Sequence, residues 1–197
     1  MKTAVIRKAN KALYTRIIAG IGGLLAGALS LGLSIYETRT GAEVAQVPAD
    51  ASVRTGQWNV TLHSASIAAE TPDGRHVADG KKALTIDLTL ENLTAESSNL
   101  YRQTLKLENV ANAPDPRFYL ARDRDALWDL QPMMPETVKA VWELPATQTL
   151  PKALKVTIVG TTYKPKDNLY AAPGWFNPTD VARVDLPLAA TTEGAAP

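Results

Sequence analysis

The side chains that most often perform chemistry in proteins are few in this chain and lie far apart. The sequence contains two histidines, His63 and His76, and no cysteine. His63 lies in a segment of alternating residues and His76 follows a Pro-Asp-Gly turn, so we expect both at the surface. The sequence shows no Ser-His-Asp arrangement, no zinc-ligand spacing and no phosphate-binding glycine loop outside residues 17–36. We therefore predict no catalytic residue, no metal site and no cofactor, and a protein that is not an enzyme.

The densest group of charged residues mixes arginine with aspartate. It comprises Asp115, Arg117, Arg122, Asp123, Arg124, Asp125 and Asp129. Several carboxylates suit Ca²⁺, but the spacing matches no calcium loop and the interleaved arginines would neutralise the site. A simpler interpretation is a set of exposed Arg–Asp pairs, each worth less than ~1 kcal/mol. A third is a recognition loop, because arginine and tryptophan are typical interface anchors; its candidate residues are Arg122, Arg124 and Trp128.

A second candidate surface is the aromatic stretch at residues 163–178. It contains Tyr170, Trp175 and Phe176, and it is long for a connection between two strands. Long loops in compact domains are often functional, and aromatic rings stack on sugars or fill a partner's pocket. The alternative is that Trp175 and Phe176 cap one end of a hydrophobic core. We expect a loop here, with these three aromatics as candidate interaction residues.

The elements that must position these residues are β-strands. Leu84, Ile86, Leu88 and Leu90 alternate with polar residues, which is the period of a strand with one dry and one wet face. Similar alternation predicts strands at 57–67, 138–144, 153–161 and 181–188, the last with one slip in phase, and shorter strands at 100–107 and 117–120. We expect at most one turn of helix, within 121–130. Seven or eight strands between proline-containing turns indicate an antiparallel β-sandwich.

Three features of this stretch resemble one family of bacterial membrane-anchored, immunoglobulin-like domains of unknown function. They are an Asn-Leu-Thr turn that ends a strand (84–94), a Leu-Gln-Pro-x-x-Pro-Glu turn leading into a strand that ends in Glu-Leu-Pro (130–145), and a closing Val/Leu strand (181–188). The resemblance covers about residues 53–188 and implies an immunoglobulin-like sandwich and a single membrane span. It implies no active site, because these are turn and strand patterns. Unlike many relatives, the chain has no lipobox cysteine.

The N-terminal part of the chain has a different composition. Residues 17–36 form an uncharged, mostly apolar run, and it follows the cations Lys2, Arg7, Lys8, Lys11 and Arg16. At about 1.5 Å per residue, a helix of this length spans about 30 Å, the thickness of a bilayer's hydrocarbon core. The positive-inside rule then places residues 1–16 in the cytoplasm and the rest across the membrane. A cleaved signal peptide is the alternative, but the apolar run continues past its candidate site at 26–28.

The predicted membrane helix is rich in small residues. Gly23 and Gly27 form a GxxxG motif, and Ala28 and Gly32 extend the spacing. Such faces let two helix backbones approach closely, so we predict packing against a second copy or another membrane protein. The alternative is that glycine and alanine are simply frequent in transmembrane helices.

The remainder of the chain is large enough for one domain. Five of the 21 lysines and arginines precede the apolar run, which leaves 16 against 20 acidic residues. This negative balance argues against nucleic acid or an anionic bilayer surface as a partner. We expect a tether at 37–52, the sandwich at 53–188 and a disordered tail at 189–197.

Together these features predict a single-pass protein of the bacterial inner (cell) membrane with a periplasmic domain. The expected function is non-catalytic: an accessory or assembly subunit of an envelope or transport complex, acting through protein–protein contacts. The alternative function is a membrane-tethered ligand- or glycan-binding module that uses Tyr170, Trp175 and Phe176.

Overall fold

The computed structural model describes residue 30 and residues 44–189 of the chain. Segment 1–16, nearly all of the predicted span at 17–36 and nearly all of the predicted tail lie outside these residues, as do the helix-packing candidates Gly23, Gly27, Ala28 and Gly32. In the described part of the chain, no helix has both the length and the apolar character needed to cross a membrane. Residues Val44–Pro197 form a compact unit of their own.

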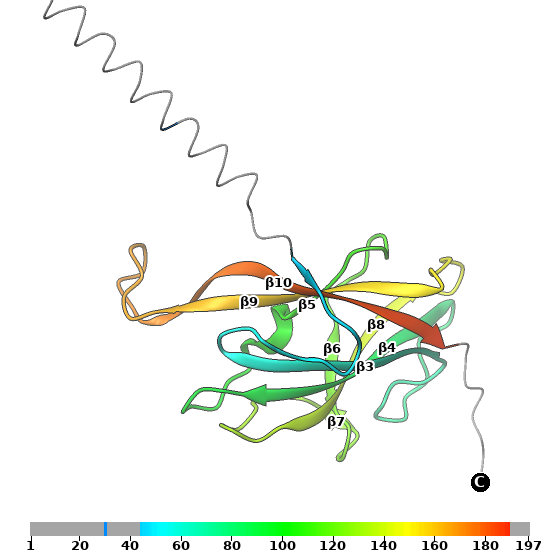
Figure 1. Ribbon diagram of the computed structural model, residues 1–197. Coiled ribbons are helices and arrows are strands. Elements are labelled where there is room, and N and C mark those ends of the chain that lie inside the picture. Colours follow the sequence, from blue (N-terminus) through cyan, green and yellow to red (C-terminus); the bar gives the residue numbers. More distant parts are fainter. Residues whose placement is uncertain (1–29, 31–43, 190–197) are drawn as a thin grey trace, which may run out of the picture. The chain divides into compact units, whose positions relative to one another are not determined.

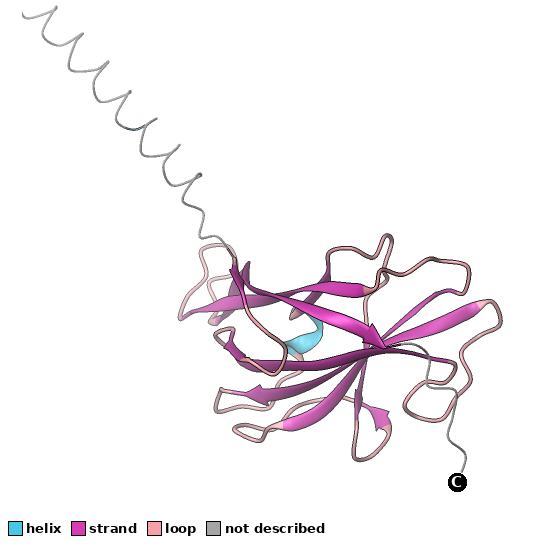
Figure 2. Ribbon diagram, turned by 45° about the vertical axis from the view of Figure 1, so that its right-hand side comes forward, coloured by secondary structure: helices cyan, strands magenta, loops and turns pink. Residues whose placement is uncertain are grey.

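This unit is built from strands and one short 3-10 helix (Figure 2). The elements are β1 (Ala45–Gln46), β2 (Ser52–Arg54), β3 (Trp58–Ala68), β4 (Lys81–Asn92), η1 (Leu100–Gln103), β5 (Leu105–Leu107), β6 (Arg117–Leu120), β7 (Asp125–Ala126), β8 (Glu136–Pro145), β9 (Ala153–Lys164) and β10 (Gly174–Ala189).

The strands form two layers (Figure 1). One layer has the order β5-β9-β10, with β1 parallel to β10. The other has the order β3-β4-β8-β6-β7, with β2 antiparallel to β3. The two layers join where the end of β10 pairs with β3 through Leu188 and Ala189. The prediction of an all-β, mostly antiparallel sandwich is confirmed, with ten strands in the described residues in place of seven or eight.

The core lies between the two layers, and the predicted strand faces form it. Leu84, Ile86, Leu88 and Leu90 are fully buried. The inward residues of β3, β8, β9 and β10 join them in one cluster, which includes Trp58 and Trp142 among others. The slip in phase predicted near residue 181 is a bulge, because the β9–β10 register shifts between Asp180 and Ala182. Strand alternation therefore located the core correctly.

The sandwich begins earlier than the expected boundary at residue 53. Ala45 pairs with Ala182, and the Asp50 N–H donates to the Leu62 carbonyl at 2.8 Å. Residues 44–52, expected to be the second half of a tether, are therefore part of the folded unit.

The structure differs from two local expectations, a helical turn that residues 121–130 could hold and a continuous strand over 100–107. Residues 121–130 contain no helical turn; they form a turn at Arg124 (φ 53°) followed by β7. The expected strand at 100–107 is split, with η1 at its start and only β5 at its end.

The expected long loop at 163–178 is present but shorter, because strand pairing continues into both of its ends. Tyr163 pairs with Trp175 and Lys164 with Gly174, so Trp175 and Phe176 lie on β10. The unpaired connection is only residues 165–173. We call residues 162–176 the arm and residues 165–173 its tip.

Candidate functional site

One end of the sandwich gathers the ends of five strands. β3, β8 and β10 begin there, and β4 and β9 end there, as their antiparallel register requires. The layers are tied at this end by a hydrogen bond from the Thr161 N–H to the Thr55 carbonyl, 2.9 Å long. The arm projects from it, on the left in Figure 1. We call this end of the sandwich the arm end.

Asn92, the last residue of β4, holds two loops together at the arm end. Its buried Nδ2 donates to the carbonyls of Glu96 (2.7 Å) and Leu130 (3.0 Å). Its Oδ1 accepts from the N–H (3.1 Å) and the hydroxyl (2.7 Å) of Thr94, and its carbonyl accepts from the Met133 N–H at 2.8 Å. The predicted Asn-Leu-Thr turn is confirmed, and its asparagine fixes the loop that follows it.

Tyr101 of η1 closes the core beneath these loops. Its ring lies edge-on to Trp58 (5.8 Å between centroids) and Phe118 (5.0 Å). Its hydroxyl lies 2.7 Å from the carbonyl oxygens of both Leu127 and Trp128 and donates its one hydrogen to them. Burial raises the pKa of the Tyr101 hydroxyl, so it stays a neutral donor. The helix is thereby fixed to the core.

A groove runs between the arm and the loop at residues 93–100. It consists of two hollows, of about 220 Å³ and 590 Å³, which share Gln57, Leu100 and Trp175 in their walls. Thr104, Val159 and Thr161 line the first hollow only, and Tyr163 and Glu96 the second. The groove has the size and mixed apolar and polar lining of a binding cleft.

Trp175 stays in the groove wall because residue 56 is a glycine. Gly56 has φ 92°, and an added Cβ would collide with the Thr161 carbonyl oxygen and lie 3.1 Å from the Trp175 ring. On its other side Trp175 contacts Tyr163, with centroids 5.4 Å apart. The wall is therefore set by a close crossing of the β2–β3 turn and β9.

The tip of the arm is ordered by Asp167. Its Oδ1 accepts from the N–H groups of Leu169 (2.9 Å) and Tyr170 (3.2 Å), and its Oδ2 lies 3.3 Å from Lys164 Nζ. The hydrogen bond from the Leu169 N–H is the largest cause that holds the pKa of the Asp167 carboxyl below its usual value, and the bonds from Tyr170 and Lys164 add to it. At the base of the tip, Tyr170 stacks on Phe176 at 6.3 Å. The tip therefore has a defined shape.

The large apolar side chains that are exposed in the described part of the chain come from three segments. All seven come from η1, from the 127–135 loop or from the arm, and they are Leu100, Trp128, Met133, Met134, Tyr163, Leu169 and Tyr170. Single exposed apolar residues are ordinary, but several that come from few segments are candidates for an interaction surface. We call this set the apolar end surface.

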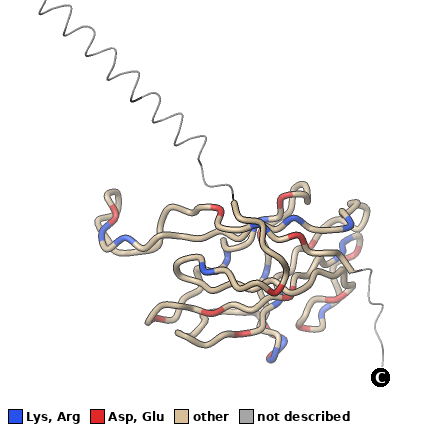
Figure 3. Tube along the Cα trace, viewed as in Figure 1, with Lys and Arg blue, Asp and Glu red and all other residues tan. Residues whose placement is uncertain are grey.

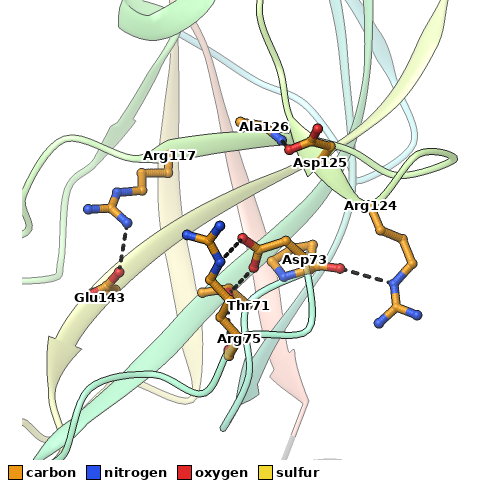
Figure 4. A network of polar contacts seen from close by, with 9 residues as sticks. Thr71, Asp73, Arg75, Arg117, Arg124, Asp125, Ala126 and Glu143 are labelled. Atoms are coloured by element: carbon orange, nitrogen blue, oxygen red, sulfur yellow. Dashed lines mark hydrogen bonds and ion pairs between the residues drawn. The ribbon is translucent and has the colours of Figure 1, made fainter.

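Three members of the arginine–aspartate group, Arg117, Arg124 and Asp125, each have a different partner (Figure 4). Arg117 pairs with Glu143 at 3.3 Å, and Arg124 donates to the Pro72 carbonyl at 3.1 Å. Asp125 accepts from the Ala126 N–H at 2.7 Å. Residues 44–189 contain no group of three His, Asp or Glu placed to hold a metal ion.

The three candidate residues of the recognition loop differ in their surroundings. Arg122 pairs with Glu136 at 3.1 Å, and Arg124 is held by the loop after β3, whereas the Trp128 side chain is 73% exposed. Both guanidinium groups thus have polar partners within the chain, and the Trp128 ring projects into solvent.

Both histidines are surface residues, as expected. His63 lies 2.6 Å from Asp50 and 2.8 Å from the Thr89 hydroxyl, and His76 lies 3.4 Å from Glu70. Neither histidine lines the groove.

Of the four predicted aromatic interaction residues, Trp175 lines the groove, Tyr170 and Phe176 lie on the arm, and Trp128 belongs to the apolar end surface. Sequence reasoning missed Gln57 and Leu100. Leu100 has the local pattern of the first residue of a strand, so no sequence signal distinguishes it from a core leucine.

Comparison with known proteins gives little further information. No protein-family model matches the chain, and no curated protein matches it. Among solved structures, an uncharacterized β-sandwich protein from Clostridium difficile 630 is similar, with 10% sequence identity and a TM-score of 0.45. The match covers 74% of this chain and 94% of that chain.

Proposed function

We propose that this protein is a non-catalytic accessory or assembly subunit of a bacterial envelope or transport complex, and that a partner protein docks at its arm end. The observation that carries the proposal is the apolar end surface. Tryptophan, tyrosine and methionine are enriched at interface centres, and they are prominent in this set.

The membrane topology belongs to the same proposal. A transmembrane helix at 17–36 would hold an immunoglobulin-like sandwich in the periplasm, close to the membrane, with residues 1–16 in the cytoplasm. The small residues Gly23, Gly27, Ala28 and Gly32 would pack against a partner's helix. The support is the charge asymmetry of the N-terminus and the length of the apolar run.

The contribution of the end surface to binding can be bounded. Burying a large apolar side chain is worth about 1.5–3 kcal/mol. Replacing Trp128 and Met133 together should therefore weaken a complex by at least about 3 kcal/mol, which is more than about 100-fold in affinity.

The test is capture of the complex from native membranes. The full chain, tagged and expressed in its own bacterium, is purified in mild detergent, and co-purifying proteins are identified by mass spectrometry. A partner recovered with the unmodified chain should be lost with Trp128→Ser/Met133→Ser and retained with the control Arg75→Ala, whose side chain is 85% exposed. Equal recovery of every partner with both variants would refute docking at this end.

The membrane helix is tested in the same experiment. Gly23→Leu/Gly27→Leu should reduce recovery of a partner that packs against the anchor. Unchanged recovery would count against that route of association.

A second candidate function is ligand or glycan binding in the groove. Trp175 and Tyr163 present aromatic rings next to the polar side chains of Gln57 and Asn99. The buried indole N–H of Trp58, which borders the groove, has no hydrogen-bond partner among the described residues. Titration with peptidoglycan fragments, followed by tryptophan fluorescence, should show saturable binding that Trp175→Ala abolishes and Trp128→Ala does not. Absence of saturation with the unmodified protein would exclude this ligand class.

A further inference from the structure

The groove and the arm tip are two unfilled surfaces on one chain with matching chemistry. The groove has apolar walls at Leu100 and Trp175 and an acidic residue, Glu96, at its edge. The tip presents two apolar side chains, Leu169 and Tyr170, beside the cation Lys166. The apolar side chains of the tip suit the apolar walls of the groove, and Lys166 is opposite in charge to Glu96.

The charges at both places are free to pair. Figure 3 shows cationic and anionic residues together at the end of the arm. Lys164 is engaged by Asp167, which leaves Lys166 as the available cation of the tip. Within residues 44–189, no ion pair engages either Lys166 or Glu96.

The tip does not fill the groove of its own chain. Leu169 is 79% exposed and Tyr170 is 69% exposed, so neither is inserted between Leu100 and Trp175. The hydrogen bonds to Asp167 fix the tip in this outward shape. An occupant of the groove must therefore come from another molecule.

We propose that the groove receives the arm tip of a second copy of this chain, so that each chain of a two-fold symmetric dimer inserts its tip into the other's groove. We call this arrangement the clasp. The inference rests on the proposed function, because it assigns a partner to one part of the apolar end surface. The arm and groove would contact the second copy, and Trp128, Met133 and Met134 would remain for another subunit.

The length of the arm suits this arrangement. Strands rise about 3.3 Å per residue, so the two steps from Thr162 to Lys164 at the end of β9 carry the tip roughly 7 Å outward. If two arms lie antiparallel, the tip of each reaches the base of the other. In a two-fold interface every contact occurs twice, so the dimer contains two Lys166–Glu96 pairs and two insertions of Leu169 and Tyr170.

The first experiment uses the absence of cysteine from the chain. Two full-length preparations with different tags, one Glu96→Cys and the other Lys166→Cys, are mixed in detergent and oxidised. The clasp predicts a disulfide-linked species that carries both tags. Arg75→Cys replaces Glu96→Cys in the control, which should give no such species. Failure to form the mixed species would overturn the proposal.

The second experiment reverses the charges. Glu96→Lys and Lys166→Glu should each raise the dimer dissociation constant about 10-fold, measured by analytical ultracentrifugation of the full chain, because two exposed pairs are lost and become repulsive. The double reversal in one chain should restore the dimer to within about threefold. Both side chains are exposed, so folding is not at risk. A double variant that dimerises as weakly as the single ones would refute the pairing.

The outcomes separate this inference from the proposed function. If the chain stays monomeric while Trp128→Ser/Met133→Ser still loses a partner, the end surface docks another protein and the clasp is wrong. If Leu169→Asp removes a captured protein from a monomeric chain, the groove takes a different occupant and the clasp is also wrong. If the clasp forms but no partner depends on Trp128, the proposed function fails and the clasp stands.

Discussion

Replacing Asn92 should loosen the whole arm end, because one side chain there makes four hydrogen bonds. Asn92→Ala removes the bonds to the carbonyls of Glu96 and Leu130 and the two bonds from Thr94. A net hydrogen bond contributes about 0.5–1.5 kcal/mol, and buried carbonyls left without donors cost more. We expect a loss of about 3 kcal/mol in the free energy of unfolding.

Asn92→Asp is a more specific test, because it keeps the shape of the side chain but replaces the amide donor with a carboxylate oxygen. The introduced carboxylate still accepts from Thr94 but faces two carbonyl oxygens in a fully buried position. Burial and those carbonyls raise its pKa in the folded state above the usual value of about 3.9. The folded state then binds more protons than the unfolded state, so stability falls as pH rises through the raised pKa. The variant should be weakest near neutral pH and recover on acidification.

Guanidinium denaturation of the unit 44–197, followed by fluorescence of the buried Trp58 and Trp142, measures both effects. With a denaturant slope of roughly 4 kcal/mol/M, the Asn92→Ala midpoint should fall by about 0.7 M. The matched control is Asn99→Ala, at an exposed asparagine that makes no capping hydrogen bond, and we expect a change within ~0.5 kcal/mol. An Asn92→Ala midpoint equal to that of the control, or an Asn92→Asp variant without pH dependence, would refute the role given to this side chain.

Three further predictions concern single positions. Gly56→Ala should destabilise the unit by at least about 2 kcal/mol more than Gly80→Ala. Both glycines have positive φ, but only at residue 56 would an added Cβ collide with a backbone atom, the Thr161 carbonyl oxygen. Equal denaturation midpoints for the two variants would contradict this close approach to Thr161. Tyr101→Phe should cost about 1–2 kcal/mol in the same assay, since the carbonyls of Leu127 and Trp128 lose their hydroxyl donor; a neutral effect would show that water replaces the donor. The pKa of the Asp167 carboxyl is lowered, so the carboxylate orders the arm tip at pH values above the usual 3.8, and this ordering is lost as pH falls through the folded-state pKa. Hydrogen exchange of the tip amides should accelerate over that fall in pH. In Asp167→Asn, hydrogen exchange of the tip should show no such transition.

The strands were predictable because each depends on local alternation. Leu84 to Leu90 show which side of β4 is dry without reference to any other strand, and the same pattern located β3, β8 and β9. The register slip near residue 181 was also visible, because a bulge changes the alternation itself.

The arm was not predictable in the same way. Pro165, Pro173, Gly174 and Pro178 indicate a loop at 163–178. β9 and β10 nevertheless pair through this stretch as far as Lys164 and Gly174. Proline is tolerated because Pro178 falls at a register shift, where a ladder hydrogen bond is already missing. The expected loop was too long at both ends because strand length at a hairpin end depends on pairing, which is not a property of one segment.

The sequence by itself determined an all-β unit with an alternating core, two isolated histidines and a strongly cationic N-terminus before an apolar run. These features follow from the composition or period of single segments. Only the tertiary structure decided that Gln57, Leu100 and Trp175 form one groove, and which of the large apolar side chains are left exposed. The groove exists because β9 crosses the turn at Gly56 and because Asn92 holds two loops in place. Both contacts join residues far apart in the chain, and no local pattern encodes their distance.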